Sequence, residues 1–131
     1  MLIRTTFLFT LFLFTLSVLA TVSGQKISVE TSKKNDAVAA FMQLSQQQIF
    51  DTAKYYDKKH VYDTALICYN LIINAPVKID DLEQQKRTIE SHHNMGVIYF
   101  YLSDYRTAYD HFIKELDLCE KYKIYSYLPN L

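Results

Sequence analysis

Two stretches of this chain share one frame: 56-YDKKHVYDTALICY-69 and 99-YFYLSDYRTAYDHF-112. Four residues of the first stretch return in the second after an interval of 43 residues: Tyr56, Tyr62, Ala65 and Tyr69 correspond to Tyr99, Tyr105, Ala108 and Phe112. A small residue between aromatics at helical spacings, recurring at such an interval, is typical of stacked helical hairpins. Each hairpin buries its apolar stripe against a neighbour, so the repeat predicts an all-α solenoid of helical hairpins.

Length and charge narrow the possible functions. The chain has 131 residues, half of them apolar, which is enough for one small domain. Its formal charge is zero, and no cluster of basic residues is present to neutralise phosphates. We therefore expect no binding to nucleic acid through this segment. Glycine and proline are scarce, which favours long helices over sheets and turns.

Residues 1–24 have the pattern of a targeting segment. Arg4 precedes an apolar stretch at residues 7–20, and small residues follow as far as Gly24. The apolar stretch is shorter than a spanning helix needs, so the pattern predicts a signal peptide that is cleaved after Gly24 or Ala20. An uncleaved N-terminal anchor is the alternative, because the leader has a single basic charge. Either way the rest of the chain is expected in the periplasm or cell envelope.

Export raises the question of a disulfide between Cys68 and Cys119. In the repeat frame Cys119 corresponds to Pro76, eight residues beyond Cys68. Eight residues span about 12 Å along a helix, whereas the Cα atoms of a disulfide lie within about 7 Å. We therefore expect both cysteines to be free and buried.

The remaining chain divides into a flexible linker at residues 25–35 and a helical domain at residues 36–131. The linker is polar and aperiodic, and Asp36 is a candidate N-cap for one long helix that ends near His60. The two hairpins are expected at about 36–75 and 80–123. Residues 124–131 resemble the start of a further helix that nothing covers, which predicts self-association.

The second hairpin resembles the tetratricopeptide repeat (TPR) family, whose pattern is Trp, two residues, Leu-Gly, two residues, Tyr, then Ala, three residues and Phe. The matching residues are His92 at the Trp position, Met95 and Gly96, and then Tyr99, Ala108 and Phe112. The first hairpin matches less well, through Ile49, Thr52, Ala53, Tyr56, Ala65 and Tyr69. The interval of 43 exceeds the family's length of about 34. Glu115 and Glu120 also depart from the family pattern.

Few residues suggest catalysis or metal binding. His92 and His93 are adjacent, so on a helix they point about 100° apart and cannot share one metal ion. The spacing of Asp80, Asp81 and Glu83 lacks the alternation of a calcium loop, and helix capping explains these acids better. No motif for a nucleotide or a catalytic nucleophile occurs, so we expect no enzyme, cofactor or metal. Gly96 inside a helix predicts a close approach by the paired helix at Ala108.

The resemblance implies a partner-binding groove that faces a protein or peptide. It would be lined by Phe50, Lys54, Glu90, His93, Val97, Phe100 and Tyr101. The alternative for Phe100 and Tyr101 is packing against a neighbouring helix. The resemblance implies an exported, non-catalytic scaffold for protein interactions. A second possibility is the truncated N-terminal sensor region of a membrane-anchored bacterial TPR regulator with a C-terminal helix-turn-helix.

Overall fold

The computed structural model describes residues 31, 32 and 34–125, and these residues form helices and turns with no strand among them. The predicted signal peptide and residues 126–131 lie outside the described residues. The chain divides after Ala39 into two compact units. Helix replaces the predicted linker at residues 31, 32, 34 and 35.

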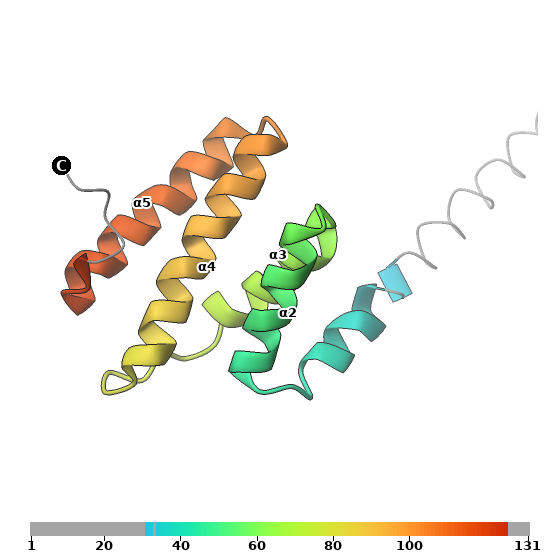
Figure 1. The fold of residues 1–131 in the computed structure, drawn as a ribbon, viewed down its shortest axis with the longest axis horizontal. Helices are drawn as coiled ribbons and strands as arrows, with labels where there is room; N and C mark the ends of the chain where they lie inside the picture. The colour runs from blue at the N-terminus through green and yellow to red at the C-terminus, as the bar shows by residue number, and fades with distance from the viewer. Residues whose placement is uncertain (1–30, 33, 126–131) are drawn as a thin grey trace, which may run out of the picture. The chain divides into compact units, whose positions relative to one another are not determined.

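The second unit contains two helical hairpins. The first pairs α2 (Gln46–Lys58) with α3 (Tyr62–Ile73), and the second pairs α4 (Leu82–Tyr101) with α5 (Tyr105–Tyr122). Figure 1 shows α4 between α5 and the first hairpin, and both α2 and α3 contact α4. The prediction of an all-α arrangement of hairpins is therefore confirmed for the described residues.

The turn inside each hairpin has the same backbone geometry. His60 and Ser103, which are 43 residues apart, both adopt the left-handed conformation with φ of 58° and 63°. The hydrogen bonds that close the two turns also correspond. In the first turn, Val61 N donates to Tyr56 O at 2.9 Å, and His60 N donates to Asp57 O at 2.8 Å. In the second turn, Asp104 N donates to Tyr99 O at 2.9 Å, and Ser103 N donates to Phe100 O at 3.0 Å. This is the Schellman pattern, which satisfies the last carbonyls of a helix. The sequence repeat is therefore a repeat of backbone structure.

The first helix of the domain is shorter than predicted. Helix at residues 34–41 stops, and α2 starts anew after Ser45. Ser45 and Gln48 form a capping box: Gln48 N donates to Ser45 Oγ at 3.3 Å, and Ser45 N donates to Gln48 Oε1 at 2.9 Å. This reciprocal cap stabilises a helix start at Ser45. The prediction of one continuous helix from Asp36 to near His60 is thus wrong.

Acidic side chains cap the helices of the second hairpin. Asp81 accepts from Gln84 N at 2.9 Å, and Asp104 accepts from Thr107 N at 3.2 Å. Each carboxylate satisfies a backbone N–H that the first helical turn leaves free. The expected capping of α4 by its acidic start is confirmed, and Asp104 caps α5.

Most predicted core positions are buried in the larger of two apolar clusters. Its buried members are Ile49, Phe50, Ala53, Ala65, Cys68, Tyr69, Ile72, Met95 and Ile98. Tyr105, whose place in the repeat predicts burial, is instead exposed, and so are the apolar residues Leu82, Ile113 and Leu116. Three of these belong to α5, which in the described chain packs closely against α4 alone.

Gly96 is buried in α4, as its predicted role in a close approach requires. A Cβ atom added at Gly96 would lie 2.7 Å from Cε1 of Phe112. The ring of Phe112, rather than Ala108, therefore occupies the space that a side chain at this position would need.

Both cysteines are free and fully buried, as predicted. Cys68 belongs to the larger cluster, and Cys119 belongs to a smaller one with Ile89 and Ile124. Burial raises the pKa of Cys68 to about 11 and also raises that of Cys119, so both stay protonated at neutral pH. Ile124, where the uncovered segment was expected to begin, is buried in this cluster.

Candidate functional site

The predicted groove residues of α2 and α4 lie on facing surfaces of these two helices. Lys54 Nζ of α2 pairs with Glu90 Oε1 of α4 at 2.8 Å. On the same surface, one turn earlier in α4 and two turns earlier in α2, Arg87 Nη1 donates to Gln47 Oε1 at 3.1 Å. Both pairs are accessible to solvent, and they make this face polar, with one net positive charge. We call the surface around Lys54, Glu90, Arg87 and Gln47 the α2–α4 face.

Phe50 does not line this face as an exposed anchor. Its side chain is 6% exposed and packs edge-on against Tyr69, with ring centroids 6.3 Å apart. Lys54 Nζ lies 5.3 Å from the centroid of the Phe50 ring. Phe50 therefore belongs to the core, beneath Lys54. The prediction that Phe50 lines the groove is wrong.

A hydrogen-bond network joins three helices next to the α2–α4 face. The hydroxyl of Tyr69 (α3) donates to Asp57 Oδ2 (α2) at 3.4 Å and accepts from Asn94 Nδ2 (α4) at 3.0 Å. Burial raises the pKa of the Asp57 carboxyl, and it raises the pKa of Tyr69 as well. The network holds the first hairpin against α4 and fixes the separation of the helices that form the face.

Exposed aromatic side chains gather at the turn between α4 and α5. Phe100, Tyr101 and Tyr105 are 56%, 68% and 61% exposed. The ring of Phe100 lies 5.4 Å from that of Tyr105 and 6.4 Å from that of Tyr101, between centroids. The rings contact one another and remain open to solvent. We call these three residues the aromatic corner; Val97, one turn earlier in α4, is half-buried.

His92, which is buried, forms a pair with the half-buried His111 between α4 and α5. Their Nδ1 atoms lie 3.0 Å apart, and His111 stacks on Tyr99 with an interplanar angle of 8°. Burial, followed by the nearby His111 and Lys114, lowers the pKa of His92 to about 4. Burial also lowers the pKa of His111. At neutral pH both rings are therefore neutral, and one Nδ1–H donates to the other Nδ1.

His93, a predicted groove residue, is directed toward α5. Its Nδ1 lies 3.0 Å from Oε2 of Glu115, and the carboxylate is 8% exposed. The ring of His93 also packs edge-on against Phe112 at 5.9 Å. Sequence reasoning missed both histidine pairs, because their partners come from different helices. The i, i+4 spacing of His111 and Glu115 on one side of α5 was the available signal.

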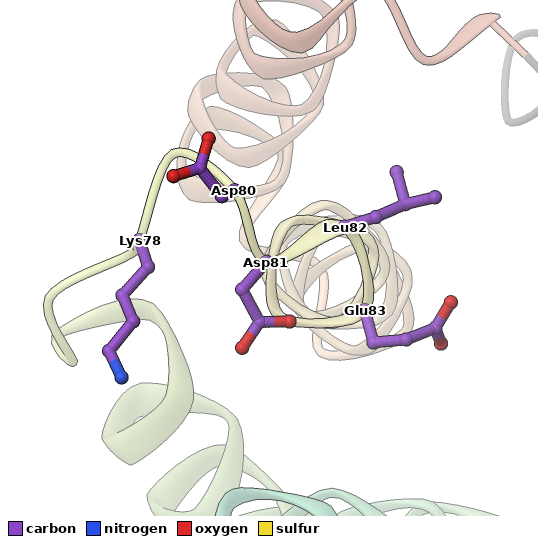
Figure 2. A pocket seen from close by; sticks show the side chains of 5 residues that line it. All are labelled: Lys78, Asp80, Asp81, Leu82 and Glu83. Atoms are coloured by element: carbon purple, nitrogen blue, oxygen red, sulfur yellow. The ribbon is translucent and has the colours of Figure 1, made fainter.

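The acidic start of α4 lines a shallow open depression with Lys78 and Leu82. Figure 2 shows the carboxylates of Asp80, Asp81 and Glu83 pointing in different directions, so they do not converge on one point. Across the described part of the chain, no three histidine, cysteine or acidic side chains are placed to hold a metal ion.

No family model matches this chain, and no curated protein or solved structure matches it. In the part of the chain that the structure describes, no helix is long and apolar enough to cross a membrane. The function must therefore be inferred from the arrangement of the helices and the surfaces they expose.

Proposed function

We propose that this chain is an exported, non-catalytic TPR-like scaffold that binds a protein or peptide. The binding surface consists of the α2–α4 face and the aromatic corner. Stacked helical hairpins with the same turn geometry after 43 residues support the TPR-like part of this proposal. The leader pattern of residues 1–24 supports export to the periplasm or cell envelope.

The aromatic corner is the observation that carries the proposal. Three large rings at one turn leave more than half of each side chain in water, which costs solvation free energy unless a partner covers them. Tyrosine and phenylalanine are enriched where proteins bind partners, because they bury a large area with few rotatable bonds. The corner therefore suits an apolar or aromatic side chain of the ligand.

The charges of the α2–α4 face restrict the kind of ligand that it can bind. Lys54 and Glu90 neutralise each other, and the pair of Arg87 with Gln47 adds one positive charge. A single net charge attracts a strongly acidic ligand only weakly and disfavours a strongly basic one. An extended or helical peptide with an apolar anchor and uncharged polar neighbours fits best, with Glu90 and Lys54 exchanging their ion pair for bonds to the peptide.

A displayed library of random peptides tests the proposal directly. We expect enrichment of peptides with an aromatic or large aliphatic residue, and binding of a synthetic peptide from the enriched pool measured by calorimetry. Phe100→Ala with Tyr101→Ala should weaken that binding by about 2 kcal/mol or more, as hot-spot truncations do. Both residues are exposed, so the fold should be unchanged by circular dichroism.

Tyr55→Ala provides the matched control. Tyr55 is an exposed tyrosine of α2, 59% accessible, that is not on the α2–α4 face. Its removal should leave peptide binding unchanged. Failure to enrich any peptide, or equal losses in the control and the double variant, would contradict the proposed binding surface.

A further inference from the structure

One side of α5 exposes large apolar side chains in a continuous row. Tyr105, Tyr109, Ile113 and Leu116 are between 39% and 64% exposed. Their spacing of four, four and three residues places them within about 80° of the helix circumference. We call this row the α5 stripe. It is separate from the side of α5 that packs on α4 through Ala108, Glu115 and Cys119.

No described element covers the stripe. Within the described residues α5 packs closely against α4 alone, and α4 lies between α5 and the first hairpin (Figure 1). Four large apolar side chains in one row exceed the scattered exposure that is normal on a soluble surface. Their arrangement is that of an amphipathic helix face that meets another helix.

Charged residues border the stripe in an order that specifies one partner. Around the helix, Arg106 and Asp117 lie within about 40° of the stripe, Asp110 lies about 60° from it, and Lys114 lies about 100° from it. All four are exposed, and none belongs to an ion pair within the part of the chain that is described. The signs alternate along the helix as plus, minus, plus, minus.

We propose that the α5 stripe binds the α5 stripe of a second copy of this chain, with the two helices antiparallel about a two-fold axis. An axis near the middle of α5 places Tyr109 opposite Ile113 of the second copy, and Tyr105 opposite Leu116. Eleven residues separate Tyr105 from Leu116, and eleven also separate Arg106 from Asp117. The axis that pairs Tyr109 with Ile113 therefore places Arg106 within one residue of Asp117 of the second copy, or about 1.5 Å along the helix.

The alternating charges favour this arrangement over others. Antiparallel pairing brings the same border of the two copies together and sets Arg106 against Asp117. A parallel pair would place the charged borders of the two copies on opposite sides of the contact, where they do not meet. An unrelated partner would not need the border to complement itself. The two-fold axis repeats each pair, so one substitution changes two contacts.

The oligomeric state of the full chain tests this proposal. Sedimentation equilibrium and light scattering over a range of concentrations should show a dimer that dissociates on dilution. Arg106→Asp places like charges opposite each other twice and should raise the dimer dissociation constant about tenfold or more at low salt. Arg106→Asp with Asp117→Arg restores opposite charges and should restore the dimer. Added salt should reduce the difference between the single variant and the parent.

Asp63→Arg is the matched control, because Asp63 is an exposed acid on α3, away from α5. It should leave the dissociation constant unchanged, and all variants should give the circular dichroism spectrum of the parent. A chain that remains monomeric at every concentration would overturn the proposal. Association that ignores both Arg106→Asp and the double exchange would also overturn it, since that outcome assigns self-association to another segment such as the apolar leader.

Discussion

Acidification should weaken this fold through His92, which is buried as a neutral ring between α4 and α5. The pKa of His92 falls from 6.5 to about 4 in the folded chain, because burial and the adjacent His111 and Lys114 disfavour its charged form. In the unfolded chain the ring is solvated and keeps its ordinary pKa. As the pH falls below 6.5, the unfolded state binds a proton before the folded state does. The free energy of unfolding therefore decreases over the interval between the two pKa values.

The size of the effect follows from the same two values. Each unit of pKa difference corresponds to about 1.4 kcal/mol, so the complete loss is on the order of 3 kcal/mol, of which about 2 kcal/mol is lost by about pH 5. Below the folded pKa both states bind the proton and the loss stops growing. His111, whose pKa burial also lowers, contributes with the same sign.

Chemical denaturation at about pH 7 and about pH 5 measures the loss, and His92→Gln assigns it. Glutamine does not titrate, and its amide can still bond to His111 Nδ1. The difference between the two pH values should therefore shrink by about 2 kcal/mol in the variant. Asp57 and Asp104, whose pKa values are also shifted, are present in both proteins. Their contributions to the pH dependence of the unfolding free energy therefore cancel in this comparison.

His60→Asn is the matched control. His60 lies in the exposed turn between α2 and α3 at a φ of 58°, a conformation that asparagine tolerates. This variant keeps His92, so it should keep the loss of stability that His92 causes between about pH 7 and about pH 5. If His92→Gln keeps the full pH dependence of the parent, a neutral buried His92 does not account for the acid sensitivity, and the reasoning fails.

Three further substitutions test the packing. Gly96→Leu should lower the free energy of unfolding by about 1 to 3 kcal/mol because the new side chain meets the ring of Phe112. Adding Phe112→Ala should recover part of that loss in thermal melts, whereas an unchanged melt for the single variant would show that the ring moves freely. Phe50→Ala should cost about 3 to 5 kcal/mol by leaving a cavity against Tyr69; a loss below about 1 kcal/mol would return Phe50 to the binding surface. Ser103→Gly should stabilise the chain by about 0.5 to 1 kcal/mol, because glycine adopts the left-handed conformation without a Cβ clash, and a lower denaturation midpoint would contradict this.

The sequence determined the periodic parts of this protein. The interval of 43 residues predicted two helical hairpins. Their turns have the same structure because each turn is short and is closed by hydrogen bonds between residues close in sequence. Ala65 and Ala108 are buried as predicted, since a small residue is needed where paired helices approach closely. The acidic caps at Asp81 and Asp104 were also readable, because capping depends on residues three positions apart. The capping box of Ser45 and Gln48 was equally local and was overlooked.

Tertiary structure decided which of two equivalent positions is buried. Tyr62 and Tyr105 occupy the same place in the repeat, yet Tyr62 packs against the larger cluster and Tyr105 is 61% exposed. The difference arises because α3 contacts both α2 and α4, whereas within the described chain α5 packs closely on α4 alone. The pairs of His92 with His111 and of His93 with Glu115 likewise depend on the rotation of α5 against α4. Periodicity gives the apolar face of each helix, but the neighbour that covers it is set by contacts between residues distant in the chain.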